Sequence, residues 1–303
     1  MKIKQIRLKN FYGNTDKELV LDIPVSRNIF NLYQSGVLRD SFLKYESMNS
    51  FFKVIPPFLL GRTSKVDACC GELFKNDPIE VTIVILSEGK EYSYSGLFFS
   101  GGKFYSESLY INNKLSIYYD ESDGISIGPG FEGSVEDEDR LIDFFNTYGF
   151  NKSFIFSRLT KMYTFLSTEL RVLDLGENLT SDKILYNLRE FSDDTKNWVR
   201  KVIPELGFGI LEVTDDWRLI TEQDTKGVIG IDSHGSGLKT LLYILPELLE
   251  CCQEDCHSKC LVLPGNLGSL HYMLLRELFE FLNKKLRSKK EVQVICSMEY
   301  FLN

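Results

Sequence analysis

Alternating apolar and polar positions predict strands in the first part of the chain. Residues 3–8 and 19–23 each alternate, which predicts two paired strands joined by a turn at residues 13–16. Further period-2 runs, separated by glycine- or asparagine-rich turns, predict an antiparallel meander over residues 79–85, 91–97, 104–110 and 115–119.

Other segments near the N-terminus depart from this alternation. Residues 28–32 predict a third strand, and residues 41–52 predict a helix that ends before Pro56 and Pro57. Residues 120–137 are rich in glycine, serine and acidic residues, which predicts a mobile acidic loop.

Apolar residues recur at helical spacing from residue 137 to about residue 191. A further helix precedes Pro204, residues 208–219 predict one or two strands, and residues 237–252 predict a strongly apolar helix. The chain closes with a strand, a helix and a strand at residues 260–263, 273–285 and 292–296. This order predicts an α/β domain with an inserted helical subdomain.

Composition narrows the class of protein. The chain has 303 residues, of which 43% are hydrophobic, so a sizeable core is expected. The net charge of −8 argues against a broadly basic surface for nucleic acid. The N-terminus lacks the apolar stretch of a signal peptide, and no run is long enough for a membrane helix. Seven cysteines in no even framework predict reduced thiols and a cytoplasmic location.

Several short motifs occur in a recognisable order. Lys9-Asn10-Phe11 closes the first strand, Tyr92-Ser93-Tyr94 lies in the meander, and Ser269-Leu270-His271-Tyr272 follows the strand at 260–263. In this order the chain resembles ABC-type ATPase heads of the SMC, RecF and OLD (overcoming lysogenization defect) kind, most closely the small OLD-like ATPases.

The resemblance implies an ABC-ATPase-like head with a mixed core sheet, an antiparallel β-meander and an inserted helical subdomain. It divides the chain into three parts. Residues 1–135 would form the N-terminal part of the ATPase-like lobe, residues 136–235 a helical lobe ending in a signature-like loop, and residues 236–303 the C-terminal part of the ATPase-like lobe.

The phosphate-binding loop of such heads lies between the third strand and the first long helix. A working loop needs closely spaced glycines, a lysine for the phosphates and a serine or threonine for magnesium. In this chain Asp40 falls where the lysine belongs and Arg39 where a glycine is required. The resemblance therefore implies a degenerate P-loop, formed by Gln34, Gly36, Arg39, Asp40 and Ser41. The alternative is an unusual nucleotide site that uses Arg39 and Ser41.

Two further motifs of the family have counterparts here. Ser233, Gly235 and Ser236 form a signature-like loop before an apolar helix; the alternative is an ordinary serine helix cap. In the family an acidic pair after the strand at 260–263 holds magnesium and activates water. That place holds Pro264, Gly265 and Asn266, without a carboxylate, and the family's switch histidine is missing after residue 296. We expect no catalytic residue.

Two other clusters carry candidate chemistry. A cysteine and histidine cluster is a candidate zinc site, although it lacks a Cys-x-x-Cys pair, and buried thiols are the alternative; it comprises Cys251, Cys252, Cys256, His257 and Cys260. A basic cluster at residues 284–290 suits either the solvated end of a helix or a DNA backbone.

The resemblance implies a catalytically inactive head that acts as a binding, scaffolding or regulatory subunit, in bacterial antiphage defence or DNA maintenance. Its expected partner is a protein, either a second copy or an active ATPase homologue. A nuclease is expected as a separate chain, nucleic acid would be reached through the complex, and no membrane is involved. No cofactor is expected; ATP and magnesium belong to the alternative of a genuine ATPase. A second alternative is a DNA-binding accessory protein, which the charge of −8 disfavours.

Overall fold

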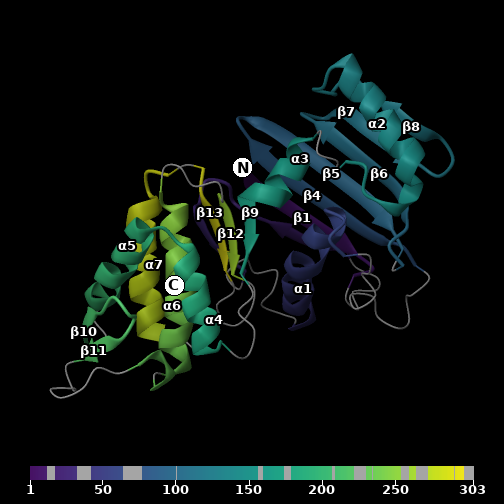
Figure 1. Ribbon diagram of the computed structural model, residues 1–303. Coiled ribbons are helices and arrows are strands. Elements are labelled where there is room, and N and C mark those ends of the chain that lie inside the picture. The colour runs from purple at the N-terminus through teal and green to yellow at the C-terminus, as the bar shows by residue number, and fades with distance from the viewer. Residues whose placement is uncertain are drawn as a thin grey trace.

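Two sheets of different kinds organise the chain (Figure 1). The computed structural model describes residues 1–11, 18–32, 42–63, 77–99, 101–155, 160–173, 179–206, 209–221, 230–233, 235–253, 259–263, 272–289 and 291–296. The larger sheet has seven antiparallel strands in the order β2-β1-β4-β5-β6-β7-β8. These strands are β1 (Lys2–Lys9), β2 (Leu19–Asp22), β4 (Ile79–Ser87), β5 (Lys90–Phe98), β6 (Phe104–Ile111), β7 (Lys114–Asp120) and β8 (Gly124–Ile127).

The predicted strand pair and meander are confirmed. Successive strands from β4 to β8 pair as antiparallel neighbours, and β1 pairs with both β2 and β4. Asn112 and Asn113 form the β6–β7 turn at φ 48° and 63°, a conformation that asparagine tolerates well. The prediction of a loop throughout 120–137 is wrong, because β8 adds a fifth meander strand there. The four residues of β8 are too few to show a clear alternation of apolar and polar positions in the sequence.

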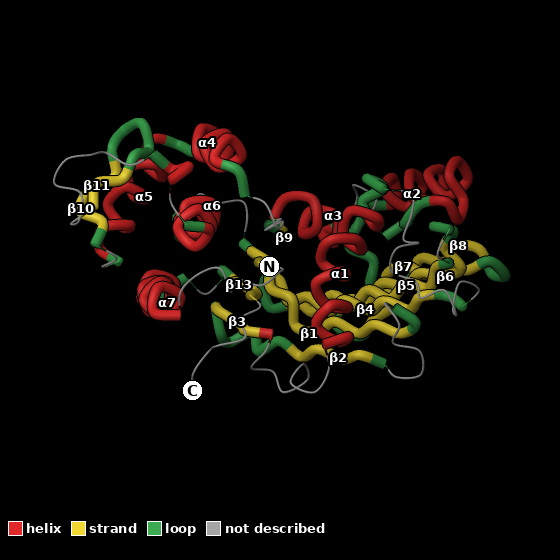
Figure 2. Tube along the Cα trace, turned by 90° about the horizontal axis from the view of Figure 1, so that it is seen from below, coloured by secondary structure: helices red, strands yellow, loops and turns green. Residues whose placement is uncertain are grey.

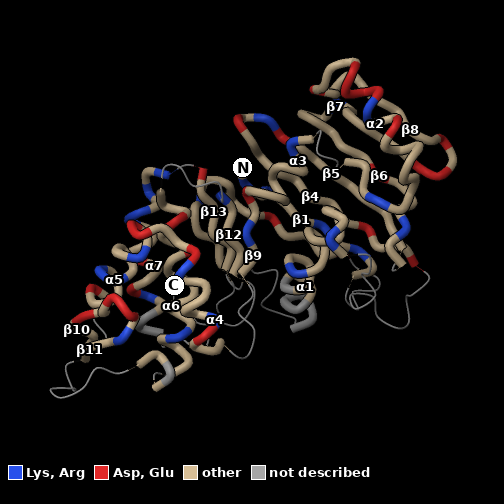
Figure 3. The backbone as a smooth tube through the Cα atoms, viewed as in Figure 1, with Lys and Arg blue, Asp and Glu red and all other residues tan. Residues whose placement is uncertain are grey.

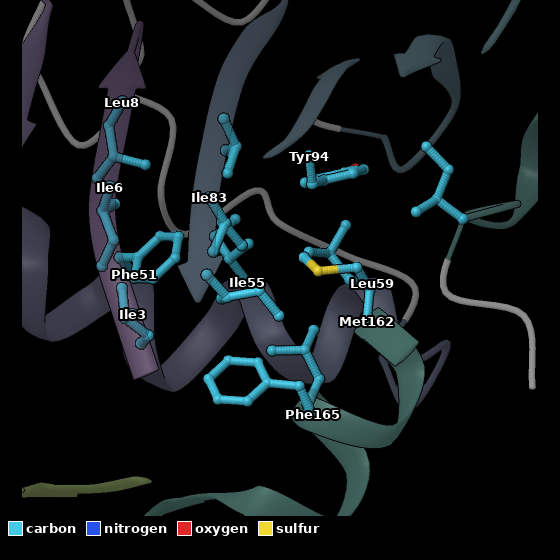
Figure 4. Packing of buried hydrophobic residues seen from close by; sticks show 14 of the residues in the cluster. Ile3, Ile6, Leu8, Phe51, Ile55, Leu59, Ile83, Tyr94, Met162 and Phe165 are labelled. Atoms are coloured by element: carbon cyan, nitrogen blue, oxygen red, sulfur yellow. The ribbon is translucent and has the colours of Figure 1, made fainter. Parts of the chain in front are cut away.

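Helix α1 (Phe42–Leu59) corrects a second prediction, since it continues through Pro56 and Pro57. Prolines inside a helix remove backbone hydrogen bonds at a cost of about 3 kcal/mol. The last turn persists because it is buried: the Phe58 ring stacks on Phe104 at 5.2 Å between centroids, and Leu59 is also buried. Figure 4 shows Ile55 and Leu59 of α1 facing the sheet beside Ile83.

Among the described helices, those that contact the large sheet lie on one of its faces (Figure 2). These are α1, α2 (Val135–Tyr148) and α3 (Lys161–Thr164), the last continuing into the π-helix η5 (Phe165–Glu169); a 3-10 turn, η4 (Gly149–Asn151), follows α2. A capping box starts α2: the Asp137 backbone N–H donates to the Ser134 hydroxyl, and the Asp137 carboxylate accepts from the Ser134 backbone N–H.

A buried carboxylate ties this layer of helices to the sheet. Glu107 of β6 is 1% exposed and accepts hydrogen bonds from the Tyr94 hydroxyl at 2.7 Å, the Ser153 hydroxyl at 2.6 Å and the Phe154 backbone N–H at 2.7 Å. Burial raises the pKa of Glu107, and these donors partly oppose that rise. Its inward position could have been found from the sequence, because Glu107, Leu109 and Ile111 share one face of a period-2 strand.

The second sheet has four parallel strands in the order β3-β13-β12-β9. They are β3 (Ile29–Asn31), β13 (Gln293–Cys296), β12 (Cys260–Leu263) and β9 (Leu170–Val172). The sequence predicted three of them and missed β9, which is three residues long and directly follows a π-helix. The two central strands, β12 and β13, are fully buried, as expected when helices or another sheet cover both faces.

The parallel sheet lies between two apolar clusters, and successive residues of β12 point alternately into each. Cys260 and Val262 belong to the cluster shared with α1 and the large sheet. Leu261 and Leu263 belong to the other cluster, which is formed with α6 (Ser236–Cys251) and α7 (Tyr272–Leu286). This sheet therefore joins the two halves of the molecule.

The insertion expected between the strands is present. It contains α4 (Ser181–Glu190), α5 (Asp193–Glu205) and a hairpin of β10 (Ile210–Val213) and β11 (Leu219–Thr221), and it packs on α6. Thr180 and Ser192 cap α4 and α5 by accepting backbone hydrogen bonds. The α/β class with an antiparallel meander and an inserted helical part is confirmed; the domain boundaries at 135 and 235 remain predictions.

One glutamine joins the two sheets where they meet. Gln293 of β13 is fully buried, and its side-chain amide donates to the Ile3 carbonyl at 2.9 Å and accepts from the Ile3 N–H at 2.8 Å. The Gln293 side chain thus pairs with β1 much as a neighbouring strand would.

Candidate functional site

The carboxyl ends of the parallel strands meet at one edge. Cys296 pairs with both Asn31 and Leu263, and Val172 pairs with Val262, so the four strands end within about one residue of one another. In open α/β sheets, ligands bind outside this edge. The geometry therefore places the candidate site beyond Asn31, Leu263 and Cys296.

Two predicted motifs directly follow these strands. The P-loop equivalents leave β3 after Asn31, and the acidic-pair equivalents leave β12 after Leu263. The residues themselves, Gln34, Gly36, Arg39, Asp40, Ser41, Pro264, Gly265 and Asn266, lie outside the described residues. The fold thus brings the starting points of both motifs together, as the resemblance requires, while their degenerate character remains a prediction from the sequence.

The signature-like loop is described on both sides of His234. Ser233 ends a short 3-10 turn, η6 (Ile231–Ser233), and Gly235 is the N-cap of α6 at φ −62° and ψ 158°. The N-cap residue is a glycine, which has no side chain to cap the helix, so the described residues do not show the alternative of an ordinary serine cap. Ser233, Gly235 and Ser236 are exposed, which leaves the first backbone N–H groups of α6 open to solvent.

The start of α6 points toward the same pole as the strand ends. Residues 252–259 connect Cys251, at the end of α6, to Cys260, at the start of β12, so helix and strand run in opposite directions against each other. The 16 residues of α6 span about 24 Å, against about 13 Å for the four of β12. The N-terminus of α6 therefore lies on the side of the sheet where the strands have their carboxyl ends.

A buried ion pair that the sequence did not reveal joins α6 to β9. Glu247 is 2% exposed and accepts a hydrogen bond from the guanidinium of Arg171, whose side chain is 45% exposed. Burial raises the pKa of Glu247 to about 7, and the charge and hydrogen bond of Arg171 oppose that rise. Arg171 is itself well hydrated, so its attraction does not overcome the desolvation of the carboxylate.

Glu247 is a carboxylate of a different kind from the missing acidic pair. It lies on α6, eleven residues after the first residue of the helix, and its partner Arg171 lies on the edge strand β9, where it pairs with Leu261 of β12. The ion pair therefore fastens α6 to the parallel sheet.

The candidate zinc ligands are only partly described. Cys251, Cys252 and Cys260 are buried thiols outside any disulfide, and Cys256 and His257 lie outside the described residues. Burial raises the pKa of Cys260 to about 12, and its thiol donates to the Gln293 side-chain oxygen at 3.5 Å. Metal ligation requires a thiolate, which this environment disfavours. Within the described ranges no group of three or more His, Cys, Asp or Glu side chains is placed to hold a metal.

The predicted basic cluster ends α7 and is partly engaged by aromatic rings. The Lys285 ammonium lies 5.5 Å from the ring centroids of both Trp198 and Phe281. Elsewhere basic and acidic positions are interspersed along the backbone of both halves (Figure 3). Among the described residues, such interspersed charge does not favour binding of a nucleic acid backbone.

Comparison with known proteins finds similarity to solved structures but no matching family or curated protein. No protein-family model matches the sequence, and no curated protein matches it. Among solved structures, the chain is similar to an SMC head domain from Thermotoga maritima, with 14% sequence identity and a TM-score of 0.47 over 99% of this chain and 90% of that one. Among the described helices none is both long and apolar enough to cross a membrane. The class that the fold defines on its own is an α/β protein with joined parallel and antiparallel sheets.

Proposed function

We propose that this chain is a non-hydrolysing ABC-type head that acts as a binding or regulatory subunit. One observation carries the proposal: β3 and β12, on either side of β13, end at the same edge of the parallel sheet, and the sequences that leave them lack the groups that hydrolysis needs. Asp40 would repel a phosphate where a lysine should attract it. Pro264 and Gly265 supply neither a magnesium ligand nor a base.

The start of α6, whose N-cap residue is the exposed Gly235, could bind an anionic group held by a partner. Open backbone N–H groups at a helix N-terminus, together with the helix dipole, attract anionic groups such as phosphates. An inactive head could therefore complete the nucleotide site of an active homologue, or pair with a second copy as a scaffold. Bacterial antiphage defence or DNA maintenance is the setting we propose for such a complex.

The first experiment is calorimetric titration of the purified chain with ATP and magnesium, with thermal shift as a second readout. We expect neither binding heat nor stabilisation at millimolar nucleotide. Saturable binding that is lost in Arg39→Ala and Ser41→Ala would refute the proposal and establish the alternative of an ATP-binding protein with an unusual P-loop.

The second experiment examines the signature-like loop. Ser236→Glu adds a negative charge to the first turn of α6, which stabilises the helix itself but repels a phosphate. Ser236→Gln is the matched neutral control. Sedimentation with an active ABC head and a non-hydrolysable nucleotide should show association that Ser236→Glu abolishes and Ser236→Gln retains; equal association of both variants would exclude phosphate capping.

A further inference from the structure

A cavity of about 230 Å³ lies on the helix-covered face of the large sheet, apart from the parallel sheet and its carboxyl edge. Strands β5, β6 and β7 form its floor, and it is closed by residues 131–133, the first turn of α2 and the start of α3. The lining residues are Tyr92, Leu109, Ile111, Ser116, Ile117, Phe131, Glu132, Gly133, Asp137, Thr160 and Lys161.

Close backbone contacts hold the wall of this cavity in place. The N–H groups of Gly128 and Gly130 donate to the carbonyls of Ser116 at 2.9 Å and Leu115 at 2.7 Å. A Cβ added to Gly128 would lie 2.4 Å from the Leu115 carbonyl oxygen, so this approach requires glycine. The segment then continues through Phe131, which packs on the apolar core, into the capping box of α2. The cavity is thus built by fixed backbone.

The floor is mostly apolar. Leu109, Ile111 and Ile117 are at most 7% exposed. The strands also contribute two hydroxyl groups, those of Tyr92 and of Ser116, which is 1% exposed.

Two residues of opposite charge, Lys161 and Glu132, line the cavity near the Tyr92 hydroxyl. Lys161 lies 2.9 Å from Glu88, and Glu132 lies 2.6 Å from Lys90 and accepts a hydrogen bond from the Tyr92 hydroxyl at 3.0 Å. The hydrogen bond with Glu88 raises the pKa of Lys161. Burial acts to raise the pKa of Glu132, but Lys90 and Tyr92 outweigh it and lower that pKa. Both groups are therefore charged at neutral pH, and exposed pairs of this kind are weak enough for a ligand to compete with them.

We propose that this cavity binds a small zwitterion with one apolar side chain, of the size of free leucine. Its carboxylate would meet Lys161, its ammonium would meet Glu132 and Asp137, and its side chain would lie on Leu109 and Ile117. A volume of 230 Å³ corresponds to about seven or eight water-sized groups, which suits leucine better than a nucleotide.

The wild-type protein tests this with three probes that differ by one charged group. L-Leucine should bind in calorimetry and saturation-transfer NMR, whereas 4-methylpentanoate, which lacks the ammonium, and 3-methylbutylamine, which lacks the carboxylate, should each bind at least about 10-fold more weakly. Equal binding of all three would overturn the zwitterion, and no binding of leucine at tens of millimolar would overturn the site.

Variants add an independent test. Lys161→Met and Glu132→Gln should each weaken leucine binding about 10-fold or more, since each removes one ligand contact. Glu88→Gln is the matched control, because it releases Lys161 from its ion pair without altering the lining, and leucine should bind it as tightly as the wild type or more tightly. Unchanged leucine affinity in a folded Lys161→Met protein would overturn the assignment.

Discussion

The buried carboxylate on α6 should make the stability of this protein fall as the pH rises. The pKa of Glu247 is raised from its ordinary value of 4.5 to about 7, so the folded state holds this proton more tightly than the unfolded state does. Between pH 4.5 and pH 7 the Glu247 carboxyl is ionised in the unfolded state but still protonated in the folded state. Folding then requires uptake of a proton, so stability falls as the pH rises. The difference, 7 − 4.5, corresponds to about 3 kcal/mol of unfolding free energy once Glu247 is ionised.

Glu247→Gln isolates this contribution. Glutamine keeps the shape and can accept from Arg171, but it has no charge to desolvate. Urea unfolding at several pH values between about 5 and 8 should show wild-type stability falling relative to Glu247→Gln by up to about 3 kcal/mol. Groups that titrate elsewhere cancel in the difference between the two proteins.

Two further variants sharpen the interpretation. Arg171→Met removes the opposing attraction, so the pKa of Glu247 should rise further and the loss of stability should move to higher pH. Glu250→Gln, on the same helix but partly exposed, removes a weaker repulsion that also raises the pKa of Glu247, so the loss of stability should move slightly to lower pH. The reasoning is refuted if the wild type gains stability over Glu247→Gln as the pH rises, because the ion pair would then outweigh desolvation.

Three other substitutions probe the contacts that hold the layers together. Gln293→Leu leaves a buried N–H and C=O of β1 without partners and should lower the unfolding free energy by about 2–4 kcal/mol in urea; a loss under about 1 kcal/mol would mean that β1 does not depend on this contact. Tyr94→Phe removes a donor from Glu107 and should cost about 1–3 kcal/mol by the same assay, and a neutral result would contradict the hydrogen bond. Gly128→Ala should cost about 1–3 kcal/mol through its clash with a β7 carbonyl, whereas Gly101→Ala, which has open space around its Cβ, should lower the melting temperature much less.

Much of the fold could be predicted because alternation is a local signal. The strands from β4 to β7 repeat apolar residues at every second position over seven or more residues, and the apolar helix before β12 carries an equally clear period. Alternation failed to predict the structure of segments whose conformation depends on tertiary contacts. Helix α1 continues through two prolines because Phe58 is buried by the sheet, and β9 exists only as a neighbour of β12.

The candidate site, too, could be predicted only in part. The order of elements predicted an α/β fold, but the strand order that places the ends of β3 and β12 at one edge came only from the structure. Glu107 and Glu247 were missed because partners far away in the sequence make their burial tolerable: Ser153 lies 46 residues after Glu107, and Arg171 lies 76 residues before Glu247. A single sequence carries no local sign of such pairing.

The glutamine that joins the two sheets has a consequence for biosynthesis. Gln293 completes contacts with residue 3, across a separation of 290 residues, and β3 likewise pairs with β13. During translation β1 and β3 therefore emerge long before the strand that completes their environment. Contacts this distant in sequence slow folding, and the waiting strand edges are exposed to intermolecular pairing. We expect nascent chains that stop short of β13 to remain dependent on chaperones, with their N-terminal strands sensitive to protease until the last strand is added.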